Sequence, residues 1–189
     1  NGLPTIFSDI TIDGQGATIA RDTAPDVPNF RLFEVAASGA LSLDSVILSG
    51  GRVTETTTVS TGAGGAILNA GSVTLTQSTV KGNEATWGGG ILNLGAASWL
   101  SVTESTFQGN RSDQNGGAIF NAGGTTIVNA STIEDNRSLT TFGGGIFNND
   151  GTVVITDSTI QNNAAWLGGG GLANSAVQGN GSLIITASQ

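Results

Sequence analysis

The segment Gly116-Gly117-Ala118-Ile119-Phe120-Asn121 decides the fold, because the chain repeats it together with a second segment, Ser131-Thr132-Ile133-Glu134-Asp135-Asn136. Copies of the first segment begin at Gly64, Gly88 and Gly143, with a more divergent copy at Gly169. Copies of the second segment begin at Ser78, Ser105 and Ser158, and their final asparagines, at positions 83, 110, 136 and 163, are 26 or 27 residues apart. A constant period of this length is typical of a chain built from stacked repeats.

Each repeat also contains short stretches in which apolar and small polar residues alternate, as in Val73–Thr76 and Leu100–Thr103. This alternation is the period of a β-strand, and the Gly, Asn, Asp and Ser residues between the stretches favour turns. Such short strands cannot bury a face alone, so we expect each to stack in parallel on the equivalent strand of the preceding coil, about 4.8 Å away. The register predicts two columns of inward side chains: Val73, Leu100, Val153 and Leu183 in one, and Leu75, Val102, Val128, Ile155 and Ile185 in the other.

The repeated asparagines are predicted to stack as well. Identical amides in register can hydrogen-bond along the stack and can satisfy the backbone groups of the turns. We therefore interpret them as two structural ladders rather than ligand contacts: Asn69, Asn93, Asn121, Asn148 and Asn174 in one, and Asn83, Asn110, Asn136 and Asn163 in the other.

The repeated segments carry a family resemblance. Gly-Gly-Ala-Ile at positions 64–67 and 116–119, with Phe107-Gln108-Gly109-Asn110, resembles the GGAI and FxxN repeats of polymorphic outer membrane proteins. More broadly, the chain resembles the right-handed parallel β-helix repeats of secreted bacterial proteins, which include adhesins, autotransporter passengers and, more distantly, polysaccharide lyases and hydrolases. The resemblance implies an all-β, right-handed parallel β-helix of about seven coils. The chain departs from the pattern at Val80, Ile133 and Ile160, which replace the Phe of FxxN.

The organisation predicted from these repeats is a single β-helix over residues 1–189. Residues 1–63 form irregular initial coils, with a projecting Thr-rich loop at 52–62, residues 64–174 form the regular repeat array, and residues 175–189 form an open terminal coil. Neither end has a recognisable cap, and the last segment, Ser182–Thr186, has the pattern of a strong strand. Two explanations stay open: the chain is a fragment of a longer protein, or its ends stack on other copies and build a filament.

The composition excludes several classes of function. The net charge of −8 argues against binding to nucleic acid or to an anionic membrane surface. The chain contains no histidine and no cysteine, so a histidine base, a cysteine nucleophile and a thiolate metal site are excluded, and we predict no cofactor. It also contains no signal peptide and no 18-residue apolar run. We interpret it as a mature or trimmed product at an extracellular or cell-surface location, with no membrane insertion by this chain.

A pair of carboxylates remains the one catalytic arrangement open to this composition. The positions just before the repeated serines are predicted to form a column of Asp44, Gln77, Glu104, Ala130, Asp157 and Ala187. Its acids are mostly separated by neutral residues, as expected of a solvated outer column. Arg111 and Arg137 are predicted to form surface ion pairs with the neighbouring Asp113 and Asp135.

Two groups of side chains are candidates for contact with a partner chain or a glycan. Aromatic residues precede the glycine runs at Trp87, Phe142 and Trp166, and could form a stacking ladder or simply pack over the loop backbone. The outward positions Ile127, Val154 and Ile184 are apolar where earlier repeats carry Thr74 and Ser101, which predicts an apolar stripe for lateral contact. Trp99 is expected in the core or partly buried.

Asn-x-Ser sequons provide candidate glycosylation sites at Asn180 and Asn129. Two further sequons, at Asn110 and Asn136, coincide with the asparagine ladder, which would hide them. Asn180 lies in a glycine-containing turn and is expected to be the most accessible of the four.

Three hypotheses of function follow. The first is a non-enzymatic extracellular structural or adhesive β-helix, a surface or filament subunit that assembles with itself head to tail or laterally and that binds glycan as a further partner. The second is a polysaccharide lyase or hydrolase of the pectin-lyase type, which requires acids and an arginine converging in one groove. The third is a passenger fragment of an autotransporter adhesin, which a downstream barrel-coding extension would identify.

Overall fold

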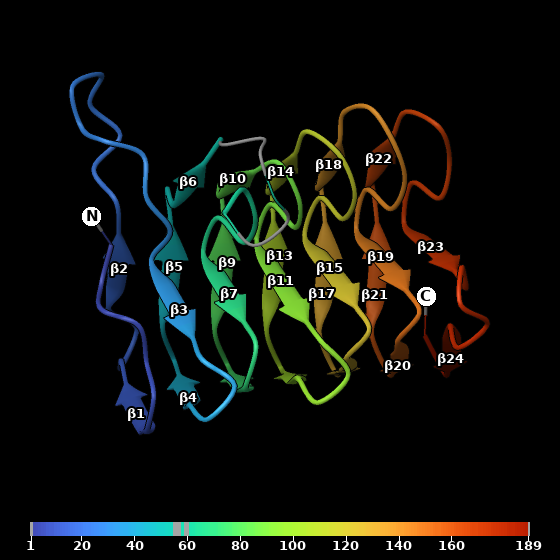
Figure 1. Cartoon of the computed structure of the whole chain (residues 1–189), viewed down its shortest axis with the longest axis horizontal. Coiled ribbons are helices and arrows are strands. Elements are labelled where there is room, and N and C mark those ends of the chain that lie inside the picture. Colours follow the sequence, from blue (N-terminus) through green and yellow to red (C-terminus); the bar gives the residue numbers. More distant parts are fainter. Residues whose placement is uncertain (1, 55–57, 59–60, 189) are drawn as a thin grey trace.

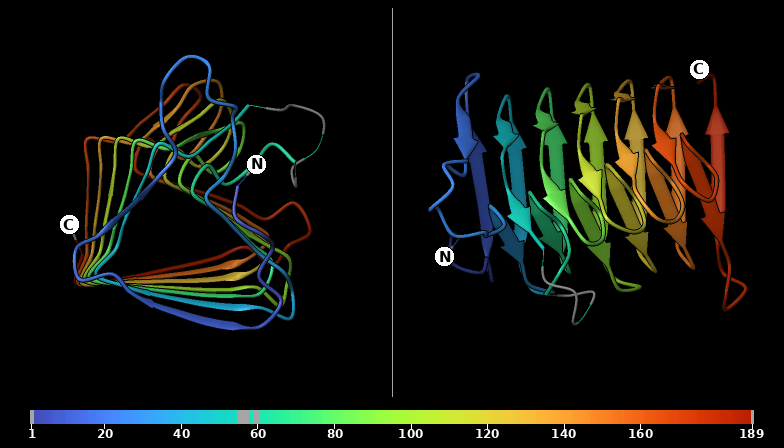
Figure 2. Two further views of the ribbon diagram at one scale, coloured as in Figure 1. Left: turned by 90° about the vertical axis from the view of Figure 1, so that its left-hand side faces the viewer. Right: turned by 90° about the horizontal axis from the view of Figure 1, so that it is seen from above.

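The computed structural model describes residues 2–54, 58 and 61–188, and these residues wind into a stack of coils. Figure 1 shows the coils side by side along the long axis, with β1 and β24 at opposite ends, and Figure 2 shows them superposed when viewed along that axis. The longest sheet contains seven strands, which corresponds to about six turns. The prediction of an all-β parallel β-helix is confirmed, with the number of coils close to the expected seven.

Four parallel sheets run along the stack. The first sheet contains β1 (Asp9–Asp13), β4 (Ala40–Asp44), β8 (Ser72–Thr76), β12 (Trp99–Thr103), β16 (Thr125–Asn129), β20 (Thr152–Thr156) and β24 (Ser182–Thr186). The second contains β2 (Thr18–Ala20), β5 (Ile47–Ser49), β9 (Thr79–Lys81), β13 (Thr106–Gln108), β17 (Thr132–Glu134) and β21 (Thr159–Gln161). The third contains β6 (Arg52–Val53), β10 (Glu84–Ala85), β14 (Arg111–Ser112), β18 (Arg137–Ser138) and β22 (Ala164–Ala165). The fourth contains β3 (Phe33–Val35), β7 (Ile67–Asn69), β11 (Ile91–Leu94), β15 (Ile119–Ala122), β19 (Ile146–Asn149) and β23 (Leu172–Ser175).

Neighbouring strands within each sheet are parallel and in register. A complete coil passes through the fourth, first, second and third sheets in that order, so the second coil contains β3 to β6 and the third contains β7 to β10. The projecting loop predicted at 52–62 is wrong at its start, because Arg52–Val53 pairs with Glu84–Ala85 as β6. Positions 55–57 and 59–60 of that loop lie outside the described residues.

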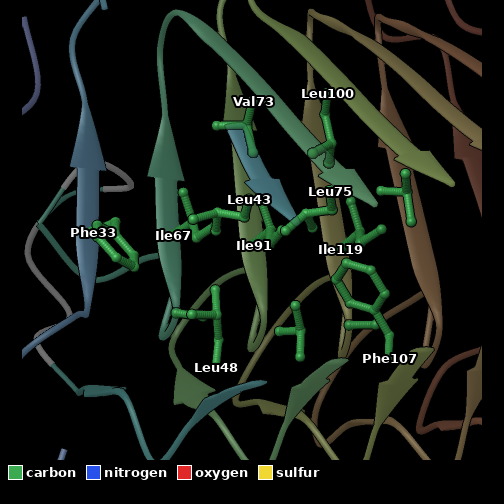
Figure 3. Packing of buried hydrophobic residues seen from close by; sticks show 14 of the residues in the cluster. Phe33, Leu43, Leu48, Ile67, Val73, Leu75, Ile91, Leu100, Phe107 and Ile119 are labelled. Atoms are coloured by element: carbon green, nitrogen blue, oxygen red, sulfur yellow. The ribbon is translucent and has the colours of Figure 1, made fainter. Parts of the chain in front are cut away.

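The two predicted columns of inward side chains are confirmed by the register of the first sheet. Val73 aligns with Leu100, and Val153 aligns with Leu183. Thr126 occupies the place between Leu100 and Val153 that the pattern had left empty. Figure 3 shows the labelled aliphatic side chains of successive coils side by side in the interior, with Phe107, which is fully buried, at one side of the group. Stacking equivalent residues thus produces one continuous core without a helix.

The first asparagine ladder lies inside the fourth sheet and is hydrogen-bonded along its whole length. Each Nδ2 donates to the Oδ1 of the asparagine in the next coil, at 2.7 Å from Asn69 to Asn93, 2.8 Å from Asn93 to Asn121, 2.7 Å from Asn121 to Asn148 and 2.6 Å from Asn148 to Asn174. The same nitrogens also donate to backbone carbonyls of the following turn, such as Gly124 O at 2.8 Å from Asn121. The turn carbonyls are enclosed by the stack and receive their hydrogen bonds from asparagine side chains instead of from water.

The second asparagine ladder closes the corner between the second and third sheets. Asn83 donates to Asn110 at 3.0 Å, Asn110 to Asn136 at 2.9 Å, and Asn136 to Asn163 at 2.9 Å. The Oδ1 atoms of Asn110, Asn136 and Asn163 also accept the backbone N–H of the preceding coil's asparagine, and that of Asn83 accepts Gly51 N–H. Each Nδ2 reaches a carbonyl such as Val80 O. A serine ladder, which was not predicted from the sequence, does the same at the corner between the first and second sheets. There, the hydroxyls of Ser78, Ser105, Ser131 and Ser158 accept backbone N–H groups from the preceding coil.

A second, smaller core lies on the outer side of the fourth sheet. Leu68, Leu92, Phe120 and Phe147 point away from the main core and are nevertheless buried. The glycine-rich loop before each strand folds back over them, as at Gly116, which has a positive φ of 67°. A β-carbon at Gly116 would lie 2.8 Å from Phe120 N, so only glycine permits this close return of the loop. The described part of the chain contains no helix long and apolar enough to cross a bilayer.

Candidate functional site

The loops between the third and fourth sheets form a ridge along the solenoid, and this loop ridge carries the three predicted aromatic residues. Trp87 aligns with Ala63, and Phe142 aligns with Gly168. The backbone links Gly88 N to Asn115 O and Gly116 N to Phe142 O, which places Asn115 between Trp87 and Phe142. Trp166 lies two residues before the aligned position, so the three rings do not form one unbroken column.

The three rings differ in how far they are available to a ligand. Trp87 is half-buried against the second core, and its Nε1 donates to Gln114 Oε1 at 3.1 Å. Phe142 covers Phe147, with ring centroids 6.3 Å apart and planes 19° apart, and is 40% exposed. Trp166 is 76% exposed and lies beside the exposed Leu167. Two rings are therefore engaged in packing, and the freely accessible apolar surface of the ridge is concentrated at Trp166 and Leu167.

These environments predict different costs of substitution. We expect Trp166→Ser to change the free energy of unfolding by less than about 0.5 kcal/mol, because its ring makes little buried contact. We expect Phe142→Ser to lower it by about 1 to 2 kcal/mol, because Phe147 loses its cover. Denaturant titration of the two variants checks this difference. Equal destabilisation would show that Trp166 is a packing residue and would remove it as a candidate contact.

The outer face of the first sheet carries the predicted apolar stripe. Ile127 aligns with Ser101 and Val154, and Val154 aligns with Ile184, so the three apolar residues lie in one outward column. From β8 to β24 this face carries no charged side chain; its outward residues are Ser72, Thr74, Thr76, Trp99, Ser101, Thr103, Thr125, Ile127, Asn129, Thr152, Val154, Thr156, Ser182, Ile184 and Thr186. Trp99 is among them and is 43% exposed, so of the two expected environments it is partly buried and does not belong to the core. Its position at the start of β12, opposite Ser72 and Thr125, directs the ring outward.

The predicted column of acids needs a correction at its first member. Asp44 pairs with Thr76 at the end of β4, and the residue equivalent to Gln77 is Ser45. Ser45, Gln77, Glu104, Ala130, Asp157 and Ala187 share left-handed φ values between 45° and 52°, which identifies them as one corner position. Glu104 accepts a hydrogen bond from Gln77 Nε2 at 2.9 Å, and Ala130 separates it from Asp157. Among the described residues, no three acidic side chains converge on a common point that could hold a metal ion.

Arginines gather on the outer face of the third sheet, where Arg52, Glu84, Arg111 and Arg137 stack in this order. Glu84 forms ion pairs with Arg111 and with Arg52, and its Oε2 lies 3.4 Å from Arg52 Nε. Arg111 also pairs with Asp113, with 3.7 Å between Nη2 and Oδ1. The ion pair predicted between Arg137 and Asp135 is not formed, because the strand directs Arg137 toward Arg111 instead. Arg52, Arg111 and Asp113 are 40 to 45% exposed and Glu84 is 22% exposed, so solvent screens the pairs and they contribute little to stability.

Arg31 is a separate case. Burial lowers the pKa of its guanidinium, and Glu34, with Oε2 at 3.0 Å from Nη1, acts in the opposite direction.

The sequons fall into two environments. Asn110 and Asn136 are buried in the second asparagine ladder and cannot be reached by a modifying enzyme without unfolding. Asn129 lies half-buried on the outer face of β16, and Asn180 lies in an exposed turn before β24. Of the two sequons proposed as glycosylation sites, Asn180 offers the more accessible side chain.

Comparison with known proteins supports the same reading of the repeat. Residues 104–122 match the family described as Chlamydia polymorphic membrane protein (Chlamydia_PMP) repeat. This segment contains Phe107 of the main core, Asn110 of the second ladder and the Gly116–Ile119 run, which leads into β15. No curated protein and no solved structure matches the chain. The chain is thus a parallel β-solenoid whose residues 104–122 match a polymorphic membrane protein repeat.

Proposed function

We propose that this chain is a non-enzymatic structural and adhesive β-solenoid of the bacterial cell surface, and that copies assemble through their terminal coils. The matched repeat belongs to a family of bacterial surface proteins, which supports an extracellular or cell-surface location. The absence of histidine and cysteine from the sequence and the separation of Glu104 from Asp157 support a role without catalysis. Cleavage of an acidic polysaccharide by the purified chain would contradict this part of the proposal.

The observation that carries the assembly proposal is the match between the two edge strands of the first sheet. β1 and β24 each contain five residues and occupy the same register, because every intermediate strand aligns residue for residue. A further step of the stack would place Leu183 against Ile10 and Ile185 against Ile12 on the inner side. Both strands present a free row of backbone donors and acceptors at the end of the sheet, which is the usual site for addition of another strand.

Apolar side chains at both ends lack the cover that equivalent residues have inside the stack. Ile10 is 40% exposed and Ile185 is 51% exposed, whereas Leu100 and Val102 of the same columns are fully buried. A cavity of about 440 Å³ beside Ile10, Ile12 and Phe33 opens at the β1 end. A smaller one, of about 290 Å³, opens beside Ile160, Leu172 and Ile185 at the other end. Stacking one end on the other would bury these residues and pair the free edges, a heterologous contact that extends without closing.

The test uses substitutions on β24. We expect the chain to form oligomers whose size grows with concentration in sedimentation velocity, and to form elongated particles in electron microscopy. Ile185→Lys should weaken this association at least tenfold, because its ammonium group would be placed against the core of the next copy. Thr186→Lys, on the outer side of the same strand, is the matched control and should still associate. A chain that stays monomeric at every concentration would overturn the proposal, and association that responds to Val154→Lys instead would identify a lateral contact through Ile127, Val154 and Ile184.

A further inference from the structure

A groove of about 710 Å³ runs along the corner between the second and third sheets over the first four coils. Its wall is formed by Arg21 and Thr23, which follow β2, and its floor by Gly50, Gly82 and Gly109, which follow β5, β9 and β13. Lys81 lies on the same edge, one residue before Gly82. We call this feature the corner groove. It is separate from the loop ridge, the first-sheet face and the terminal cavities.

Arg21 is the most unusual residue of the groove, because it is buried without a carboxylate partner. Only 7% of its surface is exposed. Its Nε donates to Gly50 O at 2.8 Å and its Nη1 donates to Asp22 O at 2.9 Å, so carbonyl oxygens hold the guanidinium in place. Its Nη2 makes no hydrogen bond with a described residue and is not closed off from the groove. A buried positive charge that is oriented but not neutralised favours an anion at its free side.

Lys81 adds a second positive charge. Its side chain is exposed on the outer face of β9 and forms no ion pair with the described carboxylates. Asp22 itself lines the groove, and Glu134 and Asp135 lie one coil beyond its last floor glycine, Gly109. Asp22 is exposed and uses Oδ1 to accept the backbone N–H of Ala24, whereas Glu134 is two coils beyond Lys81 and accepts hydrogen bonds from Gln108 and Gln161. Among the residues that line the groove, Arg21 and Lys81 outnumber Asp22, which leaves one excess positive charge on a chain whose net charge is −8.

The glycines of the groove floor leave the side chains of Arg21 and Lys81 accessible. The corner position is Gly50, Gly82 and Gly109 in the second, third and fourth coils, and it becomes Asp135 and Asn162 in the fifth and sixth. All five residues have φ values between 54° and 69°, so this backbone tolerates asparagine and aspartate. A β-carbon added at Gly82 or Gly109 would meet no atom within 4 Å. Glycine therefore keeps the floor open beside Arg21 and Lys81, and side chains occupy the corner beyond them.

We propose that the corner groove binds the anionic groups of an acidic oligosaccharide, with Arg21 and Lys81 contacting its carboxylate or sulfate oxygens. The three floor glycines span two coil spacings, roughly 10 Å, which suits an extended chain better than a single small ion. Hydroxyl groups of Thr23 and Ser49 line the groove and can bond sugar hydroxyls. This proposal names a ligand for the adhesive role and does not depend on end-to-end assembly, since the groove lies on the side of the stack.

Calorimetric titration with an oligogalacturonate, a sulfated oligosaccharide, a neutral oligosaccharide and sodium sulfate tests the proposal. We expect at least one acidic oligosaccharide to bind, the neutral one not to bind, and affinity to fall as salt concentration rises. Lys81→Gln should weaken binding about tenfold. Gly109→Asp should weaken it more than Gly109→Asn, because both side chains occupy the floor and only the aspartate repels the ligand.

Asn162→Asp is the matched control, since it introduces the same charge at the same corner position two coils beyond the groove. It should leave binding unchanged. All variants should keep the circular dichroism spectrum and thermal midpoint of the parent chain, because the left-handed corner accepts these residues. The proposal is overturned if no acidic oligosaccharide binds, if Lys81→Gln binds as tightly as the parent, or if free sulfate binds as tightly as the oligosaccharides. Oligomer size by sedimentation is read separately, so failure of this site and failure of end-to-end assembly remain distinguishable.

Discussion

Replacement of Asn121 by alanine is expected to lower the free energy of unfolding by about 3 to 5 kcal/mol. Asn121 is fully buried in the middle of the first asparagine ladder. Its Nδ2 donates to Asn148 Oδ1 and Gly124 O, while its Oδ1 accepts from Asn93 at 2.8 Å and from Thr126 Oγ1 at 3.0 Å. Alanine removes all four bonds and leaves several buried polar atoms without partners. The surrounding coils enclose the site on both sides, so the loss cannot be repaired locally.

Asn129→Ala is the control for this substitution. Asn129 lies on the adjacent strand, β16, but its side chain is on the outer face and half-exposed. We expect its replacement to change the free energy of unfolding by less than about 0.5 kcal/mol. Chemical denaturation followed by circular dichroism measures both variants. Similar stability of the two would contradict the structural role assigned to the ladder.

Replacement of Gly117 by alanine is expected to cost about 3 kcal/mol or more. Unlike Gly116, Gly117 does not have a positive φ, so the reason for glycine is contact rather than backbone conformation. An added β-carbon would lie 2.6 Å from Arg137 N and 2.7 Å from Arg137 C, and closer still to Gly144 O. These are backbone atoms of the next coil, which hydrogen bonds such as Arg137 N to Asn110 O hold in place. The coils would have to separate to admit a methyl group.

Gly109→Ala provides the comparison. Gly109 has a φ of 62°, and a β-carbon there meets nothing within 4 Å. Its replacement should lower the free energy of unfolding by about 1 to 2 kcal/mol, because alanine must adopt a left-handed conformation but meets no steric clash. Thermal unfolding of the two variants separates the effects. A loss for Gly117→Ala no larger than that for Gly109→Ala would show that adjacent coils can move apart, and would contradict the close approach of the glycine runs.

The coiled architecture follows from the repeats in the amino-acid sequence. The period of 26 or 27 residues and the strand alternation predict parallel stacking, because equivalent side chains recur at one azimuth of the solenoid. Inward columns such as Val73 and Leu100 follow directly, and so do the partners of Asn121 within its ladder. The matched family segment at residues 104–122 contains the same repeated positions.

Register at the irregular second coil could not be predicted in this way. Matching Ser45 to Ser78 by residue type placed Asp44 in the acid column, whereas the chain aligns Val46 with Ser78 and Ser45 with Gln77. Sheet register is decided by which residues the core accepts: Leu43 must align with Leu75, and this moves its neighbours by one position. The different accessibility of Phe142 and Trp166 could not be predicted either. Phe142 aligns with Gly168 and not with Trp166, so Phe142 packs on Phe147 while Trp166 stays exposed.

The meeting of residues from distant parts of the sequence in the corner groove depends on the folded stack of coils. Arg21 and Gly50 are 29 residues apart, and Lys81 and Gly109 come from two further coils, yet they line one groove. No local pattern marks Arg21 as buried, since its burial results from the loop after β2 folding over the next corner. The sequence repeat predicts the residues that occupy equivalent positions in every coil. The groove depends on what does not recur, and such residues become neighbours only when the stack brings their coils together.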